Sequence, residues 1–188
     1  MKKNLTYSLV ILLAAMASFQ AFGIYRSSNG RLASSSAVIP AVVGEILPEI
    51  GIRNMATGKE TTLSQTLSDT PLRCKFVYFF DPECPACQSA ARSWANRSAI
   101  TDGAVNVPVL WITLSSDVTG SRSFLQQNSI PVDGFSAGQT DAHRQFGVVS
   151  IPTVWGVQGN TIEFIDSGIN GTDPTTLPVD WCEESADA

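Results

Sequence analysis

An apolar segment that runs directly into two closely spaced cysteines restricts the fold of this chain more than any other feature. Residues 72–80 are mostly β-branched or aromatic with little polar alternation, as expected of a strand that is buried on both faces. Cys84 and Cys87 follow shortly after, and Pro85 between them suits the first position of a helix. We therefore expect a buried strand, a short loop and a helix that begins at the two cysteines. The apolar face of that helix consists of Ala90, Ala91, Trp94 and Ala95.

The remaining segments alternate between patterns typical of strands and patterns typical of helices. Residues 49–67 indicate two short strands around a turn at 56–59, and then a helical turn. The order of all the segments predicts an α/β fold with a mixed central sheet flanked by helices. The other expected elements are a strand at 104–115, a helix at 117–130 capped by Asp117, a short strand at 132–138, a short helix at 139–148, and a hairpin at 152–168 that turns at 158–160.

The N-terminus has the pattern of an export segment. Lys2 and Lys3 precede twenty uncharged residues, Leu5 to Ile24. That length just spans the hydrocarbon core of a bilayer, whereas the strongest apolar run within it is short enough for a signal peptide. A cleaved signal peptide and a retained membrane anchor therefore both stay open. Either one places the rest of the chain in the periplasm or on another extracytoplasmic face, anchored to the inner membrane if the segment is kept.

Beyond residues 1–24, composition divides the chain into a linker and one domain. Residues 25–41 are rich in Ser, Gly and other small residues, which indicates a linker, and residues 42–188 form the domain. The hydrophobic content of 44% suits a domain with a substantial core. The net charge is −5, and nucleic-acid binding would require clustered Lys and Arg. We expect no nucleic-acid partner.

The C-x-x-C spacing is compatible with a redox couple, a structural disulfide, half of a zinc site or two ordinary buried residues. A zinc site needs four ligands, and the chain offers only His143 and two scattered cysteines besides this pair. We therefore expect no metal, and a surface position for His143. Cys84 falls at the start of a helix, where the unpaired N–H groups and the helix dipole favour a thiolate. Cys84 is then the attacking sulfur, and Cys87, one turn further, is the resolving thiol.

The two remaining cysteines, Cys74 and Cys182, form a candidate second disulfide. Cys74 begins the buried strand, and the segment "DWC" that ends at Cys182 could pack back on the sheet. Sequence gives no distance between them, so two separate thiols stay open as the alternative.

These motifs together resemble the thioredoxin fold, and specifically exported thiol–disulfide oxidoreductases of the TlpA/ResA type. The resemblance rests on "FVYFFDPECPAC" and, far downstream, "FGVVSIPTVWGVQGNTIEFIDSG". It covers about residues 42–171, in which "VVGEILPEIGIRNMATGKETTLSQTL" is similar to the N-terminal β-hairpin extension of that family. It implies a protein-disulfide oxidoreductase that needs no cofactor.

The resemblance also assigns a second part of the site. It implies a cis bond before Pro152 and a position beside the redox pair, where the backbone of Ile151 would bind an extended substrate strand. The partners would be client proteins with disulfides or thiols and a membrane electron donor. The direction would be reductive, for example in the maturation of cytochrome c or of a redox enzyme.

The sequence departs from the family pattern at three places around the redox pair. Glu83 stands where many members have Trp, Tyr78 stands where they often bury an acid, and Ala90 stands where TlpA/ResA-type proteins often have Glu. The usual proton-handling carboxylates are therefore missing. Glu83 and Asp81 are the remaining candidates for modulating the pKa of the pair.

A different class of function stays open at this point. The domain could be a non-catalytic binding or assembly module for the maturation of a periplasmic redox protein, in which the C-x-x-C pair is dispensable. Covalent trapping of clients by a Cys87→Ser variant would distinguish the two functions.

Overall fold

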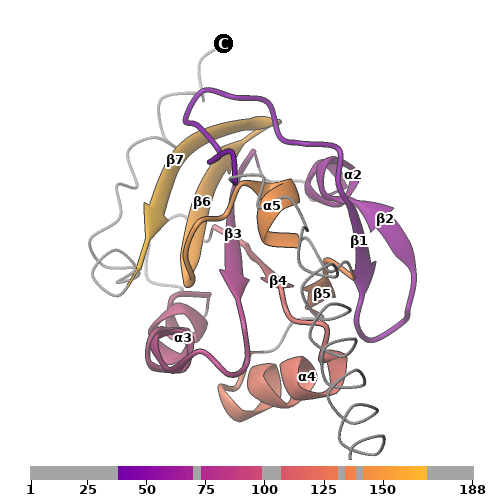
Figure 1. Ribbon diagram of the computed structural model, residues 1–188, viewed down its shortest axis with the longest axis vertical. Helices are drawn as coiled ribbons and strands as arrows, with labels where there is room; N and C mark the ends of the chain where they lie inside the picture. The colour runs from indigo at the N-terminus through magenta and orange to yellow at the C-terminus, as the bar shows by residue number, and fades with distance from the viewer. Residues whose placement is uncertain (1–37, 70–72, 99–106, 131–133, 139–141, 169–188) are drawn as a thin grey trace, which may run out of the picture. The chain divides into compact units, whose positions relative to one another are not determined.

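The computed structural model describes residues 38–69, 73–98, 107–130, 134–138 and 142–168, which form a seven-stranded sheet flanked by helices (Figure 1). The order of elements along the chain agrees with the order predicted from the sequence. The strands are β1 (Gly51–Asn54), β2 (Glu60–Thr62), β3 (Cys74–Phe80), β4 (Val109–Thr113), β5 (Phe135–Ser136), β6 (Thr153–Gln158) and β7 (Thr161–Ser167). The helices are α2 (Leu63–Ser68), α3 (Pro85–Ser98), α4 (Val118–Gln127) and α5 (Ala142–Phe146).

The sheet has the strand order β2-β1-β5-β4-β3-β6-β7, with β3 near its middle. Strands β3, β4 and β5 are parallel to one another, because helices α3 and α4 connect them. Strand β6 pairs antiparallel with β3, and β7 pairs antiparallel with β6 at one edge of the sheet. The hairpin β1–β2 joins the opposite edge through an antiparallel pairing of β1 with β5. The predicted mixed sheet and N-terminal hairpin are both confirmed.

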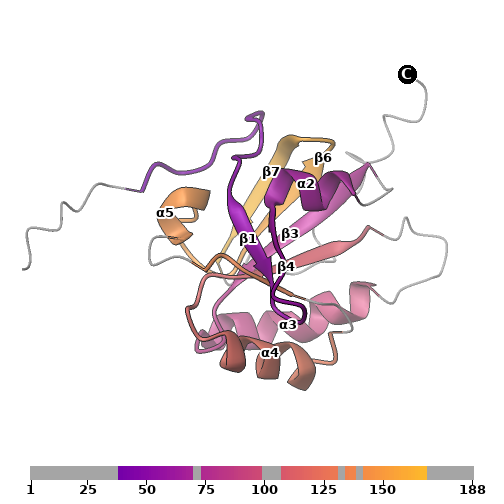
Figure 2. The same cartoon turned by 90° about the vertical axis from the view of Figure 1, so that its right-hand side faces the viewer.

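Helices cover both faces of the sheet (Figure 2). Helices α3 and α4 lie on one face, and α2 and α5 lie on the other, so each face has its own hydrophobic core. Every residue of β3 is buried, because this strand contributes side chains to both cores. Its alternation places Phe76, Tyr78 and Phe80 under α3 and α4, and Val77 and Phe79 under α2 and α5. This explains the apolar run at 76–80 in the sequence.

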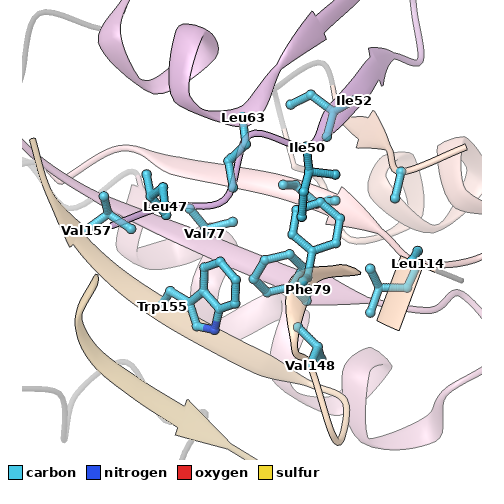
Figure 3. Close-up of a cluster of buried hydrophobic side chains, with 14 of the residues drawn as sticks. Leu47, Ile50, Ile52, Leu63, Val77, Phe79, Leu114, Val148, Trp155 and Val157 are labelled. Carbon is cyan, nitrogen blue, oxygen red and sulfur yellow. The ribbon is translucent and has the colours of Figure 1, made fainter. Parts of the chain in front are cut away.

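The core on the α2/α5 face is built from apolar side chains of nearly every element on that side (Figure 3). Phe79 lies at its centre, with its ring centroid 4.5 Å from that of Trp155 and 5.0 Å from that of Phe146. The labelled side chains in Figure 3 are Leu47, Ile50, Ile52, Leu63, Val77, Phe79, Leu114, Val148, Trp155 and Val157.

The N-terminal hairpin turns where the sequence predicts. The side-chain oxygen of Asn54 accepts hydrogen bonds from the N–H groups of Ala56 and Thr57, at 2.9 and 2.8 Å. Gly58 then adopts a φ of +72°, which glycine reaches without steric cost. Arg53 and Glu60 form an ion pair across the two strands.

The segment before β1 is held against the domain from at least Ala41 onward. The Ala41 N–H donates to the carbonyl oxygen of Gly147 at 3.1 Å, and the Leu47 N–H donates to that of Asn160 at 2.9 Å. A Cβ on Gly147 would lie 2.4 Å from the Ala41 nitrogen, so glycine permits this close approach. The predicted export segment, residues 1–24, lies outside the described residues. Within the described ranges, no helix is long and apolar enough to cross a membrane.

Candidate active site

The loop between β3 and α3 is a hydrogen-bonded turn that presents Cys84 at the carboxyl end of a buried strand. The Asp81 carboxylate accepts the Glu83 N–H at 2.8 Å, and the Asp81 carbonyl oxygen accepts the Cys84 N–H at 3.1 Å. The side-chain amide of Gln88 donates to the carbonyl oxygen of Pro82 at 3.0 Å. The turn is thereby connected to the first turn of the helix that follows, which fixes the position of Cys84.

Cys84 occupies the N-cap position of α3. Its carbonyl oxygen accepts the first helical hydrogen bond, from the Gln88 N–H at 3.1 Å. Its sulfur accepts the Cys87 N–H at 3.2 Å, which is the contact that a capping Ser or Asp oxygen usually makes. A sulfur that receives an N–H at a helix N-terminus lies where negative charge is favoured. The predicted placement of Cys84 at the start of the helix is confirmed.

The two cysteines differ in accessibility. Cys84 is half-buried, whereas Cys87 is fully buried, and both are free thiols in this structure. Burial raises the pKa of the Cys87 thiol well above its ordinary value, and its hydrogen bond to Cys84 and the charges of Cys84 and Asp81 raise it further. A backbone hydrogen bond from Asp81 opposes this shift. Cys87 therefore holds its proton in a site that solvent does not reach.

The loop before β6 meets the redox pair at the same end of the sheet. Strand β6 runs antiparallel to β3 and pairs Thr153 with Phe79, so the residues just before β6 lie beside the end of β3. The Ile151–Pro152 peptide bond is cis, as the resemblance implied. The Cys84 thiol points to the carbonyl oxygen of Ile151 at a distance of 3.9 Å.

A small network of hydrogen bonds holds this loop. The Thr153 hydroxyl contacts the carbonyl oxygen of Ser150 at 2.6 Å and the Ser167 hydroxyl at 3.1 Å. The Gly168 N–H donates to the carbonyl oxygen of Pro152 at 2.9 Å. Strand β7 thus supports the segment that faces Cys84.

The other residues singled out in the sequence lie in different places. Glu83 is exposed, so Asp81 is the neighbouring carboxylate whose charge reaches Cys87. His143 is exposed, as predicted, with Nδ1 3.4 Å from the carbonyl oxygen of Val148. Cys74 lies at the opposite end of β3 from the site and is disulfide-bonded, whereas Cys182 lies outside the described residues. Among the described residues, no group of acidic, His and Cys side chains could hold a metal ion.

One polar group under α3, the hydroxyl of Tyr78, has no role that the sequence pattern predicts. The hydroxyl of Tyr78 is buried in the same core as Cys87 and, within the described residues, is the single buried side-chain oxygen or nitrogen without a hydrogen-bond partner. Its position six residues before Cys84, where a buried acid was expected, is the signal that could have identified it.

A sheet of this order, a C-x-x-C pair at the start of the helix after its central strand, and a facing cis-proline loop define a thioredoxin-like fold, and comparison with solved structures shows the same fold. A secreted Mycobacterium tuberculosis disulfide oxidoreductase homologous to E. coli DsbE is 16% identical, with a TM-score of 0.53 over 71% of this chain and 90% of that one. A thioredoxin-family thiol:disulfide interchange protein from Chlorobium tepidum is 16% identical, with a TM-score of 0.57 over 76% and 98%.

A third similar structure is the thioredoxin domain of a thiol-disulfide oxidoreductase from Bacteroides vulgatus. It is 12% identical, with a TM-score of 0.57 over 72% of this chain and 95% of that one. No protein-family model matches the chain, and no curated protein matches it by sequence. The predicted fold class is confirmed, and the TlpA/ResA subtype stays a prediction.

Proposed function

We propose that this protein is an extracytoplasmic thiol–disulfide oxidoreductase that exchanges disulfides with client proteins through Cys84 and Cys87. The observation that carries the proposal is the asymmetry of the pair. Cys84 is half-buried at a helix N-terminus with its sulfur 3.2 Å from the Cys87 N–H, whereas Cys87 is fully buried and its pKa is raised. An accessible thiolate next to a shielded thiol is the arrangement that attack followed by resolution requires.

The reaction proceeds in two exchanges and needs neither metal nor organic cofactor. The Cys84 thiolate attacks one sulfur of a client disulfide, and the other client sulfur leaves as a thiolate. Cys87 then gives up its proton and attacks the Cys84 sulfur, which releases the second client thiolate and leaves a Cys84–Cys87 disulfide. The client gains two electrons, and a donor with a thiol pair must reduce the disulfide for the next turnover.

The loop of Ile151 and Pro152 is the proposed binding surface for the client. Its carbonyl oxygen at Ile151 lies 3.9 Å from the attacking sulfur, so a client strand bound to this backbone would place its disulfide at Cys84. Asp81, whose charge raises the pKa of Cys87, is the proposed modulator of the pair, and exposed Glu83 is a weaker candidate for that role.

The reductive direction, the membrane electron donor and a place in the maturation of cytochrome c or of a redox enzyme are the finer parts of the proposal. The name of one similar structure, a secreted oxidoreductase homologous to DsbE, supports an extracytoplasmic location. A reductase should have a reduction potential well below the roughly −120 mV of a strong oxidant such as DsbA. A measured value near that figure would rule out the reductive direction and leave disulfide exchange itself intact.

Cys74 and Cys182 are the proposed second disulfide. Of the four cysteines in the sequence, Cys84 and Cys87 are free and Cys74 is disulfide-bonded, which supports this pairing. Peptide mapping without reductant should recover the two cysteine peptides as one linked species. Recovery of Cys74 bound to either active-site cysteine would show that the pairing is wrong.

The decisive experiment traps the mixed disulfide. A Cys87→Ser variant keeps the attacking sulfur and cannot resolve, so it should accumulate covalent adducts with a disulfide-bonded client that dithiothreitol releases. The matched control, Cys84→Ser, should form no adduct and should lose at least about a thousandfold in exchange rate. If Cys87→Ser forms no adducts and Cys84→Ser retains the function of the protein, the domain is the non-catalytic module instead.

A further inference from the structure

Tyr78 combines complete burial with an unused hydrogen-bonding group. Its side chain has no exposed surface, and its hydroxyl has no hydrogen-bond partner, alone among the buried side-chain polar atoms of the described residues. Leaving such a group unsatisfied is costly, so an unpaired buried hydroxyl calls for a physical reason. Phenylalanine would fill the same space without that cost, so the packing around Tyr78 does not explain why a hydroxyl is present.

The hydroxyl belongs to the core that contains the resolving cysteine. Helix α3 turns back over β3 and buries a stripe of three residues, Cys87, Ala91 and Trp94, against it. The Tyr78 ring lies under this stripe, with its centroid 5.6 Å from that of Trp94 and 4.5 Å from that of Trp111. Tyr78 and Cys87 therefore share one water-excluded environment.

The electrostatics of this core point to a donor at Tyr78. Burial raises the pKa of the Tyr78 phenol, and the negative charges of Cys87 and Cys84 raise it further. The phenol consequently keeps its proton throughout the physiological range. A neutral O–H in a water-excluded core can stabilise a nearby anion by hydrogen bonding without itself losing a proton.

We propose that the Tyr78 hydroxyl donates a hydrogen bond to the Cys87 sulfur while that sulfur carries negative charge. The inference rests on the proposed exchange function and names a further residue for it. In the step concerned, the thiolate of a reducing dithiol attacks the Cys84 sulfur and the Cys84–Cys87 bond breaks. The electron pair of that bond stays on Cys87 as a thiolate, which is protonated when the second thiol of the reducing dithiol gives up its proton and releases Cys84. The Tyr78 O–H bond stays intact throughout.

This role gives a physical reason for the unpaired hydroxyl. In the structure the hydroxyl makes no hydrogen bond to the Cys87 sulfur or to any other atom, and the raised pKa of Cys87 favours its neutral thiol, a weak acceptor. As the Cys84–Cys87 bond breaks, the Cys87 sulfur becomes the best acceptor in the core, and hydrogen bonds to charged groups are stronger than those between neutral groups. The hydroxyl then makes its hydrogen bond mainly in the transition state for breaking the Cys84–Cys87 bond and in the Cys87 thiolate that results. A hydrogen bond made in that transition state lowers the barrier to reduction of the disulfide.

The experiment is the Tyr78→Phe variant, which removes the hydroxyl and keeps the ring. The disulfide form is prepared, and its reduction by dithiothreitol is followed at several pH values. A poorer leaving thiolate should slow reduction about tenfold across the pH range. The melting temperature of the dithiol form should stay unchanged or rise by a few degrees, because an unsatisfied hydroxyl has been removed. Slower chemistry in an equally or more stable protein is a result that a purely structural role would not produce.

A matched control separates packing from hydrogen bonding. Phe76 lies on the same face of β3, and its ring centroid is 5.2 Å from that of Trp94, but it has no hydroxyl. A Phe76→Leu variant should melt at a lower temperature and be reduced within about twofold of the original rate. Equal losses of rate in Phe76→Leu and Tyr78→Phe would overturn the inference, because packing would then account for both.

The outcomes distinguish this inference from the function on which it rests. If Tyr78→Phe is reduced at the original rate, the hydrogen bond is not made and the inference is wrong, while the exchange function stands. If the unmodified protein forms no Cys84–Cys87 disulfide that dithiothreitol can reduce, the proposed function itself fails.

Discussion

The two faces of the central sheet use the same strand for different purposes. On the α2/α5 face, β3 contributes Val77 and Phe79 to a core of apolar side chains (Figure 3). On the α3/α4 face, it contributes Tyr78 to a core that also contains the sulfur of Cys87. The first core supplies stability, and the second excludes water around reactive groups.

The difference shows how a small α/β domain can carry a buried thiol without losing its fold. A buried polar group that lacks a partner destabilises the protein, and the single such group among the described residues, the Tyr78 hydroxyl, lies on the α3/α4 face. The opposite face is free to pack aromatic rings closely, as Phe79, Phe146 and Trp155 do. Substitutions in the α2/α5 core should therefore change mainly the free energy of unfolding, and substitutions around Cys87 should change mainly the rate of disulfide exchange.

The largest expected effect on stability comes from a substitution in the core of the α2/α5 face. Phe79→Ala removes a fully buried ring from between Phe146 and Trp155, and it should lower the free energy of unfolding by about 3 to 5 kcal/mol. Denaturant unfolding monitored by tryptophan fluorescence measures this. The rate of disulfide exchange per folded molecule should stay within about twofold of the original. A tenfold loss of that rate in the folded fraction would show that the two faces are not separable.

A smaller effect on stability is expected when pH is raised, because Cys87 lies in the core on the α3/α4 face. The pKa of Cys87 is raised above its ordinary value of 9.0 by burial, then by Cys84, and by the charge of Asp81, and Tyr78 faces the same core. The unfolded chain therefore releases this proton first as the pH rises. The dithiol form should lose stability above about pH 9, by at most about 1.4 kcal/mol per pH unit for this proton.

The disulfide form provides the contrast, since it has no proton on Cys87 to lose. Denaturant unfolding at about pH 8 and about pH 10 should show a steeper loss in the dithiol form than in the disulfide form. In the Cys87→Ser variant the extra loss should disappear. Parallel losses in both redox forms would mean that Cys87 is no harder to ionise in the fold than in the unfolded chain.

The fold was predictable from sequence because its strongest signals are local. The apolar run at residues 76–80 of β3 reflects burial on both faces, and Asp117 and Gly58 have the chemistry that a helix cap and a turn require. The extent of the short elements was not predictable. Strand β5 has two residues where the pattern suggested up to seven, because pairing with β1 and β4 on its two sides, and not propensity, decides where it ends.

The site was only partly predictable, because some of its properties depend on contacts between distant segments. The position of Cys84 at a helix start follows from local sequence, and the cis bond at Pro152 followed from the resemblance. Which acid acts on Cys87 depends on the turn, which brings the charge of Asp81 to Cys87 and leaves Glu83 exposed. The unpaired hydroxyl of Tyr78 depends on every neighbour that could have bonded to it, and no single segment contains that information.

The smallest expected effect tests whether helix α4, on the same face of the sheet as the redox pair, can be destabilised without slowing disulfide exchange. The Asp117 carboxylate caps α4 by accepting the Gly120 N–H at 2.9 Å, and Phe124 of that helix stacks on Phe80 at 4.7 Å. Asp117→Ala should lower the free energy of unfolding by about 1 kcal/mol, and Asp117→Asn, which keeps a capping oxygen, should lose less. Both variants should exchange disulfides at the original rate, because Asp117 makes none of the contacts that hold the sulfurs. If exchange is slower in Asp117→Ala and returns to the original rate in Asp117→Asn, helix α4 helps to position the redox pair. The chemistry on the α3/α4 face would then depend on the stability of both helices that cover it.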